Sequence, residues 1–199
     1  MAARSALSVA DGVHSAKMQR LSEIVDESRA NNSKLLIFNY FRPVVECAAA
    51  VVGSGCAQLT GSVSVGERQR RINEFDNAEG FAALALQIDV GGVGLNLQSA
   101  SVVVLMEPQY KPSTEWQAVK RAHRMGQPRR VVVHRLIAED SIDERLVGLG
   151  WLKTELFAQL ARQSDLANSP LSASDPMIDE HRLLAQERER LGLPPPSAA

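Results

Sequence analysis

A glutamine and two arginines recur at helical spacing, at Gln117, Arg121 and Arg124. On an α-helix, where successive residues are about 100° apart, these positions fall within roughly 60° of one another. The apolar residues of 118–122 would give the same helix a separate face for packing. Planar, permanently charged guanidinium groups stabilise negative charge spread over phosphoryl oxygens. The spacing therefore fits a phosphoryl-transfer site, although a solvated cationic helix face would show the same pattern.

Length and charge favour one globular domain with a local, not global, preference for anions. The chain has 199 residues, of which 45% are hydrophobic and 23% charged, which suffices for a core without disulfides. A net charge of −1 gives no overall attraction to nucleic acid or to an anionic membrane. Between Gln117 and Arg135, however, there are six Lys or Arg residues and no Asp or Glu. We expect an anion-binding surface in that region.

The sequence gives no sign of a metal site or a membrane segment. Cys47 and Cys56 lie in apolar surroundings without a CxxC pair, which predicts buried, unreactive thiols in a reducing cytoplasm. His123 and His134 are interpreted as structural. No apolar run approaches the roughly 20 residues that span a bilayer, and the first residues lack the apolar core of a signal peptide. We therefore expect a cytoplasmic protein without metal ligands or membrane contact.

Amphipathic segments alternate with short apolar runs along the chain. Helices are expected over 15–30, 43–52, 64–75, from Ser113 through the two arginines, and over 141–163. Strands are expected over 35–38, 56–59, 84–88, 102–106 and 131–136. Ser64 with Glu67, and Ser141 with Glu144, have the spacing of a capping box, and Ser113 would cap the arginine helix less perfectly.

The strand segments are uninterrupted apolar runs, which predicts an α/β fold with a mostly parallel sheet between two helical layers. Ligands of such folds gather at the carboxyl ends of the strands. Three loops leave those ends with unusual residues: Thr60–Ser62, Gly91–Gly94, and Glu107–Pro108 before the arginine helix. We expect them to lie on one rim of the sheet.

The glycines of 91–94 allow a backbone to approach a phosphate or ribose closely, although a sharp turn between strand and helix explains them equally well. The dinucleotide pattern GxGxxG is not met, and no segment matches the phosphate-binding loop GxxxxGK[ST]. If this domain contacts ATP, another part must hold most of its phosphates.

Several segments resemble, in order and spacing, the Snf-type ATPases of helicase superfamily two. They are 35–41 for motif IV, 59–62 with Glu67 and Arg68, 91–97 for motif V, 117–127 for motif VI, and 133–144 for the closing strand and helix. The core of motif VI, Arg-Ala-His-Arg-Met-Gly-Gln, is highly specific, and the similarity covers about residues 15–162.

The resemblance implies the second RecA-like lobe of a two-lobed motor that hydrolyses ATP between its lobes. Arg121 and Arg124 would then be arginine fingers that reach the γ-phosphate, and Gln117 would orient the nucleotide or couple the lobes. Gly92, Gly94 and Asn96 would lie near the sugar and phosphates. ATP and its Mg²⁺ would be held mainly by the first lobe, whose Walker A lysine and acidic box do not occur here. The isolated chain should be inactive.

Double-stranded DNA is the second partner that the resemblance implies, after the first lobe of the same protein. Asn39, Thr60, Gly61 and Arg68 are the candidate contacts to its phosphates, although simple turn formation would also explain Thr60 and Gly61. Oligomerisation is not indicated. Trp116 and Trp151 are interpreted as core or inter-lobe contacts.

The chain also departs from the family pattern. Lys120 replaces a common acidic residue, and Gln87-Ile88-Asp89-Val90 replaces the usual small hydroxyl and alanine at a place that can contact DNA. Motif IV and Met125 are more similar to bacterial members, so a nucleosome need not be the target and the protein could associate with a nucleoid.

We expect a lead-in over 1–13, the lobe over 14–163, and a linker and tail over 164–199. The alternative function is a non-enzymatic nucleic-acid-binding or regulatory module derived from such a lobe. A stand-alone nucleotide-binding protein is disfavoured, because the phosphate-binding loop is missing.

Overall fold

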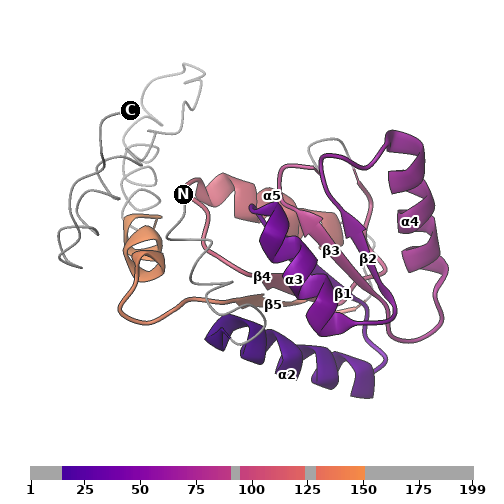
Figure 1. The fold of residues 1–199 in the computed structure, drawn as a ribbon, viewed down its shortest axis with the longest axis horizontal. Helices are drawn as coiled ribbons and strands as arrows, with labels where there is room; N and C mark the ends of the chain where they lie inside the picture. The colour runs from indigo at the N-terminus through magenta and orange to yellow at the C-terminus, as the bar shows by residue number, and fades with distance from the viewer. Residues whose placement is uncertain (1–14, 91–94, 124–128, 151–199) are drawn as a thin grey trace, which may run out of the picture.

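The computed structural model describes residues 15–90, 95–123 and 129–150, in which helices alternate with parallel strands (Figure 1). The helices are α2 (Ala16–Ala30), α3 (Arg42–Val52), α4 (Val65–Asn77) and α5 (Pro112–Ala122). The strands are β1 (Leu35–Asn39), β2 (Cys56–Leu59), β3 (Ala83–Gln87), β4 (Val102–Leu105) and β5 (Val132–Arg135). A further helix follows Ser141, and its described part spans 142–150.

The strands form one sheet in the order β2-β3-β1-β4-β5, and every neighbouring pair in it is parallel. The central strand β1 is buried along its whole length, which is why its sequence is apolar without alternation. The predicted α/β fold is confirmed. Because all strands run the same way, their carboxyl ends lie along one edge, and the loops expected to carry the site leave from that edge.

The two faces of the sheet are covered by different helices (Figure 1). Leu35 and Ile37 of β1 pack in the core layer of α2 and α3. Leu36 and Phe38 pack in the opposite layer, with α4 and α5. Successive side chains of a strand point to opposite faces, so one short apolar run supplies both layers. Burial on both faces fixes the position of each helix relative to the strand ends.

Serine side chains cap α2 and α4. Ser15 Oγ accepts a hydrogen bond from a first-turn N–H at 3.2 Å, and Ser64 Oγ accepts one from the Glu67 N–H at 3.3 Å. These bonds satisfy donors that have no partner within the helix. The Glu67 carboxylate bonds to Arg70 and Arg71, so the reciprocal half of the predicted capping box is replaced by ion pairs along the helix.

Two other predicted helix starts differ in detail. Ser113 does not cap α5, because the helix begins at Pro112, whose ring fixes a helical φ at the first turn, and Lys111 occupies the cap position. Ser141 Oγ accepts from the Asp143 N–H at 3.1 Å as a cap. Glu144 accepts from the Asp140 N–H at 3.1 Å, so its contact lies one residue earlier than the capping box predicts.

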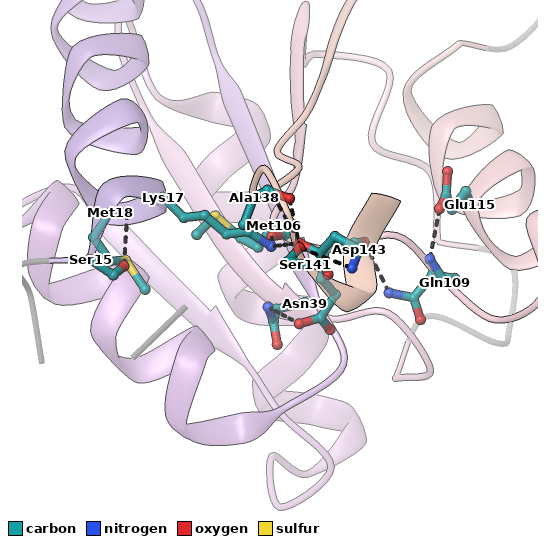
Figure 2. Close-up of polar contacts among 11 residues, drawn as sticks. Ser15, Lys17, Met18, Asn39, Met106, Gln109, Glu115, Ala138, Ser141 and Asp143 are labelled. Atoms are coloured by element: carbon teal, nitrogen blue, oxygen red, sulfur yellow. Dashed lines mark hydrogen bonds and ion pairs between the residues drawn. The ribbon is translucent and has the colours of Figure 1, made fainter. Parts of the chain in front are cut away.

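A buried ion pair joins α2 to the helix after Ser141 (Figure 2). Lys17 Nζ bonds the Asp143 carboxylate, and the two side chains are 4% and 0% exposed. Lys17 also donates to the Met106 carbonyl at the end of β4, at 2.9 Å. Asp143 accepts a further bond from the Ala138 N–H at 3.3 Å. The pair therefore fixes the helix after Ser141 against α2 and the central strands.

Replacing Lys17 with Met should destabilise the chain by about 3–5 kcal/mol, because the Asp143 carboxylate would stay buried without its cation. The double variant Lys17→Met/Asp143→Leu should recover most of that loss, since both charges are then removed. Urea unfolding monitored by circular dichroism measures the difference. Arg20→Met, which breaks an exposed pair on the same helix, is the control and should leave the midpoint unchanged. Equal effects of Lys17→Met and Arg20→Met would contradict the assignment.

The two cysteines are reduced thiols that are partly, not fully, buried. Burial raises the pKa of Cys56 to about 11, and a backbone hydrogen bond with Ala85 opposes that shift.

Cys56 should therefore react with iodoacetamide at pH 8 roughly 100-fold more slowly than a thiol with a pKa near 9, because the thiolate is the nucleophile. Mass spectrometry of the Cys56 peptide from native and urea-unfolded chain measures the rate. Equal rates in the two states would contradict the prediction.

Candidate functional site

Several of the residues predicted to contact ligands lie at the carboxyl edge of the sheet. Asn39 and Gln87 end the neighbouring strands β1 and β3 and are aligned with each other in register. Thr60 and Gly61 follow β2 directly, and Glu107 follows β4. Two of the three loops predicted to share one edge, Thr60–Ser62 and Glu107–Pro108, are therefore found there, and the third, Gly91–Gly94, lies outside the described residues. Hydrogen bonds between side chains and backbone connect the described loops.

Asn39 is fully buried and holds the loop after β1 in place. Its Oδ1 accepts from the Phe41 N–H at 2.6 Å, and its Nδ2 donates to Glu107 Oε2 at 3.1 Å. Glu107 is 1% exposed, and its Oε1 accepts from the Tyr40 N–H at 2.8 Å. The Asn39 side chain, labelled in Figure 2, is therefore turned away from solvent and bonded to Glu107, so it supports the neighbouring backbone instead of presenting its own amide to a ligand.

The turn after β2 exposes one backbone donor. Thr60 is 5% exposed; its Oγ1 lies 2.9 Å from Ser62 Oγ, and its carbonyl accepts from the Val63 N–H at 3.1 Å. Gly61 is exposed, and its N–H donates to Gln87 Oε1 at 2.9 Å. Thr60 thus has the turn-forming contacts that the sequence left open, while the Gly61 amide lies at the surface where a phosphate oxygen could replace the Gln87 oxygen.

Arg68 on α4 braces two loops. Its Nη1 donates to the Val90 carbonyl and its Nη2 to the Val63 carbonyl, each at 3.2 Å. Its Nε is buried without a hydrogen-bond partner among the described residues. The guanidinium therefore connects the turn after β2 to the segment that precedes the glycine stretch, and its charge lies close to the candidate nucleic-acid surface.

Arg121 is a half-buried cation on α5. The helix is fixed by Ala118 and Ala122, both 0% exposed, as the predicted packing face requires. Burial lowers the pKa of Arg121, and the negative charge of Asp89 opposes that shift. Arg121 Nη1 is buried without a hydrogen-bond partner among the described residues. A guanidinium with an unsatisfied donor is suited to an anionic ligand, because an added acceptor would restore the hydrogen bond lost on burial.

The remaining predicted nucleotide contacts are only partly described. Gln117 is exposed on α5, and Asn96 is exposed beside Leu97, whose N–H donates to the Arg121 carbonyl at 3.2 Å. Gly92, Gly94 and Arg124 lie outside the described residues. The predicted helical stripe is shorter than expected, because α5 ends at Ala122 and His123 takes the non-helical ψ of 89°. The stripe contains Gln117 and Arg121, and Arg124 follows the helix end.

Two polar residues that connect the rim to α5, Gln109 and Glu115, are not identified by the sequence pattern. Gln109 Nε2 donates to the Glu107 carbonyl at 3.3 Å, and the Gln109 N–H donates to Glu115 Oε1 at 2.7 Å. Glu115 is 5% exposed and also pairs with Arg135 at the end of β5. Figure 2 shows Gln109 and Glu115 facing each other beside α5. The only local signal was a charged residue, Glu107, directly after an apolar strand.

Trp116 is 64% exposed, which is incompatible with the core position considered from sequence. It lines a pocket with Pro108, Pro112, Arg135 and other residues of α5 and 142–150.

The two histidines interpreted as structural differ in exposure. His123 is exposed, whereas His134 is half-buried, and burial lowers the pKa of His134. In the described part of the chain, no cluster of three or more His, Cys, Asp or Glu side chains could hold a metal ion.

Residues 16–126 match the family described as the helicase conserved C-terminal domain. The chain belongs to this family. Over 161 residues it is 34% identical to the ATP-dependent helicase fft1 of Schizosaccharomyces pombe, covering 79% of this chain and 17% of fft1. The matched part of the chain therefore corresponds to about a sixth of that relative's length. The described sheet and its helices have the RecA-like fold of a helicase C-terminal lobe.

Solved structures agree with this assignment. The C-terminal part of the Fun30 ATPase domain superposes with a TM-score of 0.65 at 30% identity, covering 69% of this chain and 46% of that structure. The Sulfolobus solfataricus SWI2/SNF2 ATPase core in complex with double-stranded DNA gives 0.60 at 30% identity, covering 76% and 32%. The expected bacterial type is not supported by these comparisons.

Within the described ranges, no helix is long and apolar enough to cross a bilayer.

Asn39→Asp should destabilise the helicase lobe by more than about 2 kcal/mol, because it removes the donor to Glu107 and places a second carboxylate beside it. Asn73→Asp, on the exposed side of α4, is the matched control and should have little effect. Thermal unfolding of both variants measures the difference. An Asn39→Asp variant as stable as Asn73→Asp would show that the buried contact is unimportant.

Proposed function

We propose that this chain is the second motor lobe of a DNA-dependent, Snf-type ATPase, completing a nucleotide site that is held mainly by a first lobe. The observation that carries the proposal is the Arg121 guanidinium, which is half-buried on a packed helix and whose Nη1 has no hydrogen-bond partner among the described residues. Membership of the helicase C-terminal domain family and the ATP-dependent helicase among its relatives support the same reaction.

Arg121 would act by charge stabilisation. The packing of α5 holds its guanidinium in place. The free-energy cost of reorganising it is therefore small when negative charge develops on the phosphoryl oxygens. Gln117 lies one turn earlier on an exposed part of α5, where it would orient the nucleotide or contact the first lobe. Arg124 would supply a second guanidinium after the helix end, and Gly92, Gly94 and Asn96 would approach the sugar and phosphates.

ATP fits the residues present, because Arg121 has a donor that no described residue satisfies, and Asn96 is exposed beside Leu97, whose N–H bonds the Arg121 carbonyl. The bound triphosphate supplies the γ-phosphoryl group that water attacks. Mg²⁺ would be held through the first lobe. This chain would bind and orient the phosphates from the other side of the cleft, with Trp116 near the inter-lobe contact.

Double-stranded DNA would lie along the turn after β2. The exposed Gly61 amide is the donor best placed for a phosphate, with Thr60 shaping the turn and Arg68 adding positive charge. Asn39 would contribute by holding the adjacent loop. Contacts of this kind bind the backbone without reading sequence. The homologous Sulfolobus core, solved in complex with double-stranded DNA, supports duplex DNA as the ligand.

Replacing Arg121 with Ala in the full-length protein should lower kcat for ATP hydrolysis by about 10³-fold, since a missing arginine finger leaves transition-state charge unneutralised. Arg121→Lys should recover little, because a point charge cannot replace the planar fork. Phosphate release with saturating duplex DNA is the assay. Arg42→Ala, which breaks an exposed pair on α3, is the control.

The chain by itself should show no turnover. Wild-type kcat in the Arg121→Ala variant, or sustained hydrolysis by the purified isolated chain, would refute the proposed function.

A further inference from the structure

The side chain of Gln87 joins two loops at the carboxyl edge of the sheet. Gln87 is the last residue of β3, and β3 lies between β2 and β1. Its Oε1 accepts from the Gly61 N–H at 2.9 Å, and its Nε2 donates to the Tyr40 carbonyl at 3.1 Å. One amide therefore uses both of its ends to connect the turn after β2 with the loop after β1.

The connection continues from Tyr40 toward the next strand. The Tyr40 N–H donates to Glu107 Oε1 at 2.8 Å, so this residue is held at its carbonyl by Gln87 and at its amide by a buried carboxylate. A movement of the Tyr40 peptide would therefore strain the contact with Glu107. Because Glu107 is 1% exposed, water cannot readily replace a lost protein donor.

From Glu107 the chain of hydrogen bonds reaches the arginine helix. The Glu107 carbonyl accepts from Gln109 Nε2 at 3.3 Å, and the Gln109 N–H donates to Glu115 Oε1 at 2.7 Å. Glu115 lies in the first turn of α5, less than two turns before Arg121. Contiguous hydrogen bonds thus link the exposed Gly61 amide to the helix that carries the candidate catalytic guanidinium.

The bond between Gly61 and Gln87 is the exchangeable step of this chain. The Gly61 amide is exposed, and a phosphate oxygen is a stronger acceptor than a neutral amide oxygen. The turn itself would persist after such an exchange, because the Val63 N–H donates to the Thr60 carbonyl and Arg68 holds the Val63 carbonyl. Only the Gln87 side chain would be released, and with it one support of the Tyr40 carbonyl.

We propose that Gln87 is a positioning residue that couples occupancy of the Gly61 amide by a DNA phosphate to the placement of α5. This inference rests on the proposed function and names how its two ligand sites communicate. Without DNA, Gln87 holds the loops in the arrangement described. With a phosphate on Gly61, Gln87 is released, and the change passes through Tyr40 and Glu107 to the first turn of α5.

The test measures coupling instead of activity alone. In the full-length protein, the dissociation constant for a mixed-sequence duplex is measured by fluorescence anisotropy, with and without a non-hydrolysable ATP analogue. Linkage requires that the two ligands change each other's affinity by the same factor. Gln87→Leu keeps the approximate size of the side chain but removes both hydrogen bonds. In this variant, the ratio of the DNA dissociation constants with and without the analogue should be about 5-fold or more closer to one than in the wild type.

Gln69→Leu is the matched control, because this glutamine is exposed on α4 and bonds only along its own helix, to Asn73. It should keep the wild-type coupling factor. Gln87→Glu is a second, nearly isosteric variant that keeps an acceptor for the Gly61 N–H but has no donor for the Tyr40 carbonyl. It should also lose coupling, and its more conservative structure guards against misfolding of the leucine variant.

The outcomes separate the two proposals. If the wild-type protein neither binds duplex DNA nor hydrolyses ATP, the proposed function fails. If the wild-type protein couples its ligands and both Gln87 variants keep the wild-type factor, Gln87 has no coupling role. A uniform loss of DNA affinity, equal with and without the analogue, would likewise overturn the inference, because it would show only a local effect on the turn.

Discussion

The arrangement of the candidate site depends on a buried carboxylate, that of Glu107. A charge with 1% exposure is tolerable only if hydrogen-bond donors surround it, and here the donors come from Asn39 and the Tyr40 backbone. These donors belong to the loop after β1, whereas Glu107 follows β4. Satisfying the carboxylate therefore requires the two loops to meet in one way. The same requirement fixes the path of the chain into α5.

A second buried charge performs the same task next to the first one. Lys17 bonds both Asp143 and the Met106 carbonyl, one residue before Glu107. Helix α2, the central strands and the helix after Ser141 are thereby held together at the end of β4. Such pairs contribute less to net stability than to selecting a single arrangement, since misplacing either partner leaves a charge buried alone. The rim and the helix after Ser141 are thus both positioned by residues at the end of β4.

Apolar burial and directional hydrogen bonds position different parts of this lobe. Apolar burial on both faces of the sheet places the helices, and its tolerance is broad because dispersion and hydration are not directional. Hydrogen bonds at the strand ends are directional and place individual groups such as the Gly61 amide. Arg121 combines both, since packing of Ala118 and Ala122 orients α5 while its own Nη1 has no hydrogen-bond partner among the described residues. A rigid scaffold that holds a cationic donor in place suits the binding of an anion, because little reorganisation is needed when the anion binds.

The sequence by itself determined the layers, the parallel sheet and the buried face of α5, because apolar periodicity is local and both faces of each strand had to be covered. It also indicated Arg121, whose motif is contiguous. Only the tertiary structure decided that Asn39 is buried, that Gln87 joins two loops, and that Lys17 pairs with Asp143. Those contacts join residues 26 to 126 positions apart, and hydrogen-bond partners so distant leave no periodic trace in the chain.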